Sequence, residues 1–122
     1  MGLFLFINTQ IISAQAFIVN ISNGLKEGKA ETISTYFDNT IDLSFSDVTN
    51  TYSKKQAEVV LQRFLSKIEP KSYLNNQKGN SAYNNSKFCI GTLATSNGNY
   101  KVYMFFILRK DIYYLKELRF EK

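Results

Sequence analysis

An apolar stripe of helical period is the clearest pattern in the chain. It occupies residues 53–68, where apolar side chains recur three or four positions apart: Ala57, Val60, Leu61, Phe64, Leu65 and Ile68. This spacing predicts a helix of about four turns with one buried face. Ser53 and Gln56 form a capping box, in which the serine hydroxyl accepts the N3 backbone N–H and the glutamine side chain reaches back to the N-cap N–H. Pro70 predicts the end of the helix, because it biases Glu69 away from helical geometry.

Two shorter helices are predicted ahead of this one. Apolar residues recur at helical spacing in the first: Phe17, Ile18, Ile21 and Leu25. Residues 26–29 contain the break after it. Residues 30–37 predict a second, short helix, which a turn at Asp38 and Asn39 follows.

Strand patterns replace the helical period elsewhere. Residues 40–46 alternate between apolar and polar positions, which predicts a half-buried strand with Ile41, Leu43 and Phe45 on one face. Residues 47–51 are compatible with a short second strand or a loop. Residues 71–74 are compatible with the start of a further strand, and the Asn-rich residues 75–86 with a connection or an irregular hairpin.

A hairpin is predicted from residues 88–95 and 100–108. Asn97-Gly98 lies between them, and this dipeptide is preferred in two-residue type I′ turns. A turn there makes Ser96 face Asn99 and Cys89 face Phe106. A last strand is predicted over residues 113–120.

The two faces of this hairpin have different implications. Opposed residues share a face, and one face is apolar throughout: Cys89, Gly91 and Leu93 opposite Phe106, Met104 and Val102. We expect this face to form the core under the helices. The other face gathers further large side chains: Phe88, Ile90, Tyr103, Phe105 and Ile107. A sheet with helices on only one side does not need this second cluster, so it predicts a partner surface. With a two-residue turn at Lys110-Asp111, Leu118 and Phe120 would fall on this second face too.

Residues 1–16 predict a secretory signal peptide. Residues 3–7 are an apolar run, and Ala14-Gln15-Ala16 is a cleavage site of the A-x-A kind. No Lys or Arg precedes Lys26, which suggests a truncated start. The alternative is that residues 3–18 begin a long first helix. The run is interrupted by polar residues and falls short of the roughly 20 apolar residues that span a membrane. We therefore expect a mature domain of residues 17–122, exported to the periplasm or cell envelope.

Composition indicates one globular domain without an evident reaction centre. The chain has 122 residues, 44% of them hydrophobic, and ten Phe and eight Tyr but no Trp imply a core of single aromatic rings. The net charge of +5 is spread over scattered lysines, so no nucleic-acid partner is predicted. Because the chain has no His to activate it, Cys89 is expected to be a buried thiol rather than a nucleophile. The sequence predicts no catalytic residue, cofactor or metal ligand.

Several stretches resemble a family of small exported bacterial proteins known as domain of unknown function 4783. They are YSKKQAE at residues 52–58, IGTLATSNGNYKVY at 90–103 and LRFE at 118–121, with GKA at 28–30 ahead of Tyr36-Phe37 resembling the family's first segment. The resemblance covers nearly all of residues 17–121. It implies the nuclear transport factor 2-like, or cystatin-like, α+β fold: a cone of two or three helices from the N-terminal half, packed into a strongly curved antiparallel sheet. It implies no activity, because the family has none assigned.

Two functions of different classes follow. The first is a non-catalytic binding or assembly module of the bacterial cell envelope, homodimeric through the second hairpin face, with an unidentified envelope protein or a small apolar ligand as further partners. The alternative is a small-molecule enzyme of ketosteroid isomerase type, with a tyrosine and a carboxylate such as Asp42 or Asp47 in the pocket. The sequence favours the first without deciding whether the protein is an enzyme. The residues expected to line a pocket are Tyr36, Tyr52, Phe64, Tyr100 and Met104.

Overall fold

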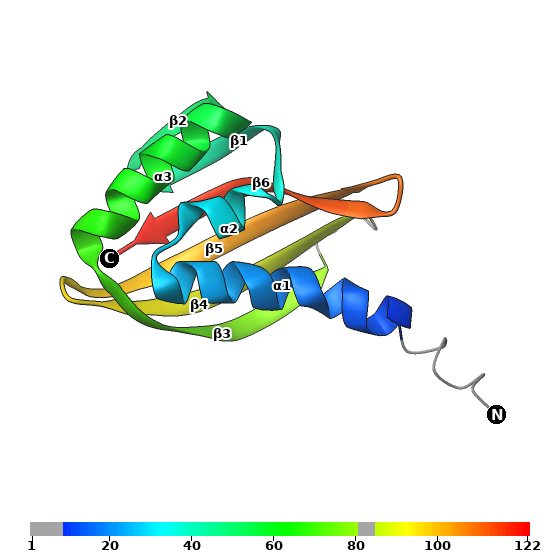
Figure 1. The fold of residues 1–122 in the computed structure, drawn as a ribbon, viewed down its shortest axis with the longest axis horizontal. Helices are drawn as coiled ribbons and strands as arrows, with labels where there is room; N and C mark the ends of the chain where they lie inside the picture. The colour runs from blue at the N-terminus through cyan, green and yellow to red at the C-terminus, as the bar shows by residue number, and fades with distance from the viewer. Residues whose placement is uncertain (1–8, 81–84) are drawn as a thin grey trace.

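Three helices pack on one side of a six-stranded sheet (Figure 1). The structure is a computed structural model that describes residues 9–80 and 85–122. The elements are α1 (Thr9–Glu27), α2 (Ala30–Ser34), β1 (Phe37–Phe45), β2 (Val48–Ser53), α3 (Lys54–Ile68), β3 (Pro70–Asn80), β4 (Ser86–Thr95), β5 (Gly98–Arg109) and β6 (Ile112–Glu121). The strand order is β2-β1-β6-β5-β4-β3. The predicted α+β class is confirmed, with one refinement: β1 runs parallel to β6, so the sheet is mixed.

The predicted capped helix is α3. Ser53 Oγ accepts the Gln56 backbone N–H at 3.3 Å, as expected. The second half of the capping box differs, because Gln56 Oε1 accepts from the Ser53 hydroxyl at 3.3 Å instead of reaching the N-cap N–H. Glu69 adopts the left-handed conformation with φ 53°, which ends the helix directly before Pro70. The stripe forms part of the core, where the four most buried members are Ala57, Leu61, Leu65 and Ile68.

The first 80 residues differ from, or complete, the predicted boundaries in several places. α1 already includes Thr9, and residues 1–8 of the predicted leader lie outside the described residues. α2 ends at Ser34, and β1 begins at Phe37, so the predicted turn at Asp38-Asn39 is strand instead. Of residues 47–51, left open between strand and loop, Asp47 lies in the turn after β1 and the other four belong to the strand β2. Part of the Asn-rich segment also extends β3, while residues 81–84 lie outside the described residues.

The β4–β5 hairpin has the predicted faces in a different register. Thr95 pairs with Gly98, so Cys89 lies opposite Met104 and not Phe106. A type I′ turn at Asn97-Gly98 needs positive φ at both residues, but only Gly98 has it, at 101°. Thr95 Oγ1 accepts the Asn97 N–H at 3.0 Å and donates to the Gly98 carbonyl at 2.6 Å, which holds the observed loop. Because the side-chain period of a strand is two, this shift of two leaves every residue on its predicted face.

A bulge in β6 corrects the prediction for the last strand. The turn is where it was expected, with positive φ at both Lys110 and Asp111. Phe106 pairs with Leu115 but Phe105 pairs with Glu117, so Lys116 is an extra residue. The resulting shift of one residue moves each later side chain of β6 to the opposite face of the sheet. Leu118 and Phe120 therefore face the core, each with 0% exposure, and the prediction that they lie on the second face is wrong.

Candidate functional site

Five large side chains lie together on the side of the sheet away from the helices. Phe88 pairs with Phe105 and Ile90 with Tyr103 across β4 and β5, and Ile107 follows on β5. All five are half-buried, and we call them the outer patch. Helix α1 packs against β3, and α3 packs against β1 and β2, on the opposite side. The structure thus brings together the five hairpin residues predicted for the partner surface.

Charged side chains of β6 border the outer patch. Glu117 lies opposite Phe105, and Arg119 lies opposite Tyr103. The Arg119 guanidinium is 3.9 Å from the Glu117 carboxylate, 3.4 Å from that of Glu121 and 5.1 Å from the centroid of the Tyr103 ring. An apolar centre with a polar, charged rim is the usual arrangement of protein–protein interfaces.

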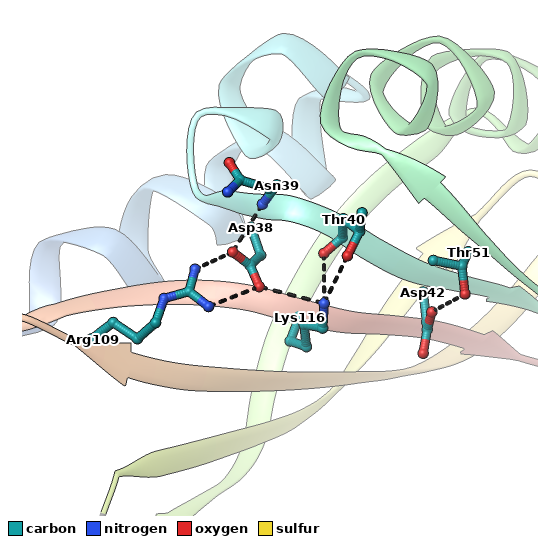
Figure 2. A network of polar contacts seen from close by, with 7 residues as sticks. All are labelled: Asp38, Asn39, Thr40, Asp42, Thr51, Arg109 and Lys116. Carbon is teal, nitrogen blue, oxygen red and sulfur yellow. Dashed lines mark hydrogen bonds and ion pairs between the residues drawn. The ribbon is translucent and has the colours of Figure 1, made fainter.

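A buried carboxylate holds the bulge of β6 in place (Figure 2). Asp38 has a 4% exposed fraction and binds Arg109 with both oxygens: Arg109 Nη1 donates to Oδ2 at 3.3 Å, and Nη2 donates to Oδ1. The Asn39 N–H donates to Oδ1 at 2.8 Å, and Lys116 Nζ lies 3.4 Å from Oδ2. Lys116 also donates to the Thr40 carbonyl and hydroxyl at 3.1 and 2.9 Å. The extra residue of β6 is therefore fixed to β1 by its own side chain.

This network lies at the bulge that sets which β6 residues reach the outer face. Past Lys116, the bulge directs Glu117 and Arg119 outward and Leu118 and Phe120 inward. The rim of the outer patch thus depends on a contact between residues more than 70 positions apart in sequence. The sequence analysis did not predict the contact of Asp38 with Arg109 and Lys116. Asp38-Asn39 is a common turn dipeptide, and no local pattern marks either cation as a partner of Asp38.

The electrostatics of Asp38 do not suit acid–base catalysis. Burial alone would raise the pKa of its carboxyl, but the hydrogen bonds from Arg109, the Asn39 N–H and Lys116, with the charge of Arg109, outweigh it and hold the pKa below the ordinary 3.8. A carboxylate held ionised by two cations is a poor proton acceptor near neutral pH. The same contact raises the pKa of the Arg109 guanidinium.

The structure distributes the five predicted pocket residues over different places. Phe64 and Tyr100 belong to an aromatic cluster, with ring centroids 5.6 Å apart, and Phe45 and Phe120 complete it. Met104 is a core residue with 1% exposure. The Tyr36 hydroxyl accepts from Asn20 Nδ2 at 2.7 Å, and Tyr52 lines a surface hollow beside α3.

The alternative of a tyrosine–carboxylate pocket gains no support from these positions. Asp42 accepts from the Thr51 hydroxyl at 2.5 Å, and Asp47 is exposed. Within the described side chains, no hydrogen bond joins a tyrosine to a carboxylate. Cys89 is buried at 1% exposure, as expected of a core thiol. In the same part of the chain, no three His, Cys, Asp or Glu residues gather to hold a metal. No helix there is long and apolar enough to cross a membrane.

Comparison with known proteins establishes the family. The sequence profile of domain of unknown function 4783 matches residues 18–121. The chain belongs to this family. A search of curated proteins finds no match. The structure is similar to that of a family member from Bacteroides ovatus, with 28% identity over 84% of this chain and 92% of the other and a TM-score of 0.79. A family member from Bacteroides fragilis is also similar, with 26% identity over 85% of this chain and 96% of the other and a TM-score of 0.79.

More distant structures agree on the fold. A domain of unknown function with a cystatin-like fold from Nostoc punctiforme is 11% identical. The match covers 89% of this chain and 74% of the other, with a TM-score of 0.69. At this identity the likeness concerns the fold alone. The fold of this domain of unknown function 4783 protein is therefore the nuclear transport factor 2-like, cystatin-like α+β fold that its residues resemble.

Proposed function

We propose that this protein is a non-catalytic binding or assembly module of the bacterial cell envelope that works as a homodimer through the outer patch. The observation that carries the proposal is the concentration of five large side chains on the side of the sheet that the helices leave open. Asp38 supports a non-catalytic role. It is the one acidic residue among the buried residues of the described chain, and its carboxylate oxygens are already bound by Arg109, Lys116 and the Asn39 N–H.

A two-fold dimer suits the chemistry of this surface. A closed dimer needs one patch that complements itself, and the outer patch joins an apolar centre to a rim holding both Arg119 and two glutamates. Each side chain is already half-buried, so its contribution falls below the roughly 1.5–3 kcal/mol of a fully exposed one. For a dimer to form, the ten side chains of two copies together have to outweigh an association cost of roughly 4–15 kcal/mol. Because each side chain is already half-buried, the expected result is a weak dimer rather than a tight one.

A lysine at the centre of the outer patch tests the proposal. Phe105→Lys should turn a dimer into a folded monomer, because two buried ammonium groups would face each other across the axis. The control is Val19→Lys, a 55% exposed apolar position on α1, which should leave the dimer intact. Sedimentation velocity reports the mass, and circular dichroism reports folding. Ile90→Lys is the second probe if Phe105→Lys fails to fold. Dimers that survive both lysines would overturn the proposal.

Export is the second part of the proposal. The A-x-A site at residues 14–16 supports it, as does the family profile, which begins at residue 18, just past that site. Protein purified from its native host should lack residues 1–16 by mass spectrometry and occur in the envelope fraction. An intact N-terminus on cytosolic protein would contradict export and leave the dimer proposal standing.

A further inference from the structure

β2 is an edge strand without the usual protection of a sheet edge. It lies at one end of the strand order and pairs with β1 alone among the described strands. Its sequence, VTNTYS, has no charged residue and no proline, and its pairing with β1 runs from Val48 to Ser53 without a register shift. Natural edges commonly use charges, prolines and bulges to prevent pairing with a further strand. β2 instead offers a regular row of backbone N–H and C=O groups.

The opposite edge strand, β3, is protected in each of these ways. It begins at Pro70 and continues with Lys71. Its register with β4 shifts twice, between Pro70 and Ser72 and between Asn75 and Gln77. Helix α1 also packs against it. The regularity of β2 is therefore a local feature and not a general property of this sheet.

A shallow hollow lies beside β2 on the helix side. Its volume is about 650 Å³, and its lining comes from β2 and α3: Asn50, Thr51, Tyr52, Lys55, Gln56, Val59 and Val60. Val59 is 55% exposed, and Val48 at the start of β2 is 58% exposed. Val48 and Tyr52 pair with Phe45, which packs against the core, and with the core residue Ile41, so they face the helix side too. A strand added along β2 would place every second side chain over the hollow and cover both valines.

The charges at this edge select the incoming segment. Lys55 is the one charged residue among the described residues that line the hollow, and Lys54 adjoins it in the first turn of α3. The N-terminus of a helix carries partial positive charge, which adds to that of the two lysines. An incoming carboxylate is attracted here, while an incoming lysine is repelled.

We propose that β2 is the docking edge for an extended segment of another protein. That segment joins the sheet as a seventh strand, sets small apolar side chains over the hollow at alternate positions, and meets Lys54 and Lys55 with a carboxylate. In this mode of recognition, main-chain hydrogen bonds supply affinity, and the alternate side chains supply specificity. The edge is separate from the outer patch, so this inference stands on different residues from the proposed dimer.

The test uses a phage-displayed library of 12-residue linear peptides, selected on the full chain. Enriched peptides should alternate small apolar residues and carry Asp or Glu near one end. Fluorescence anisotropy with a synthetic copy should show at least tenfold weaker binding to Val59→Glu and to Lys55→Glu. Val19→Glu is the matched control, since Val19 has the same 55% exposure on α1, and binding there should stay within twofold.

Main-chain pairing has its own readout. N-methylation of alternate peptide amides should abolish binding in one register and leave it within a few-fold in the other, because only every second amide of an added strand faces β2. A library without enriched peptides, peptides indifferent to Val59→Glu, or equal effects of the two methylation registers would overturn the proposal. So would a change in the sedimentation of the unliganded protein on Val59→Glu, which would assign the edge to a second copy.

Discussion

The two faces of the β4–β5 hairpin carry similar side chains in different surroundings. On the inner face, Cys89, Met104 and Phe106 are at most 1% exposed under the helices. On the outer face, Phe88, Phe105 and their neighbours are half-buried, although they alternate with the inner residues along the same strands. Both sets lie on the same two strands, β4 and β5. The difference therefore lies in what covers each face: the helices cover the inner face, and the outer face is the apolar surface that the proposed dimer would cover.

The largest contrast is expected between two adjacent phenylalanines. Phe106→Ala should lower the free energy of unfolding by about 3–5 kcal/mol, because it opens a cavity in the core. Phe105→Ala should cost less than half as much in dilute protein, since its ring is already partly in water. Urea melts at low and high protein concentration measure both. The cost of Phe105→Ala should grow with concentration while that of Phe106→Ala stays constant, and equal costs at every concentration would remove the distinction between the faces.

A smaller loss of stability is expected from a change at the Asp38 network beside the β6 bulge. Asp38→Asn should lower the free energy of unfolding at pH 7 by about 1–2 kcal/mol, because Lys116 and Arg109 lose a buried charged partner while solvent screens the half-exposed arginine. Because the folded-state pKa of Asp38 is depressed, its contribution is full above the ordinary pKa of 3.8 and is lost as pH falls further.

Urea melts at several pH values test this sign. The difference in stability between the wild type and Asp38→Asn should be constant from pH 7 to about pH 5 and shrink below about pH 4. Arg119→Gln, which loses the exposed rim pairs instead, serves as the control and should show less than about 1 kcal/mol at any pH. A difference for Asp38→Asn that persists undiminished at pH 2 would mean that the ion pairs do not hold the bulge.

Local patterns predicted what depends on local chemistry. The apolar stripe of α3 and its Ser53 cap follow directly from residue spacing. The two hairpin faces were predicted correctly although the turn was not, because a shift of two residues leaves each side chain on the same face. The Lys116 bulge follows from a distant contact with Asp38 and has no local signal. That contact also overrides the turn preference of Asp38-Asn39 and starts β1 early. The outer patch could be predicted because its five members lie in one hairpin, whereas its charged rim could not.

The concentration dependence of the wild-type mass tests the central claim most directly. Sedimentation equilibrium from low to high micromolar protein should show the weight-average mass rising from one chain to two and no further, as a closed two-fold contact through the outer patch requires. A protein that remains a single chain at high micromolar concentration would contradict the account. The apolar outer face would then have to be explained by something other than a second copy of the chain.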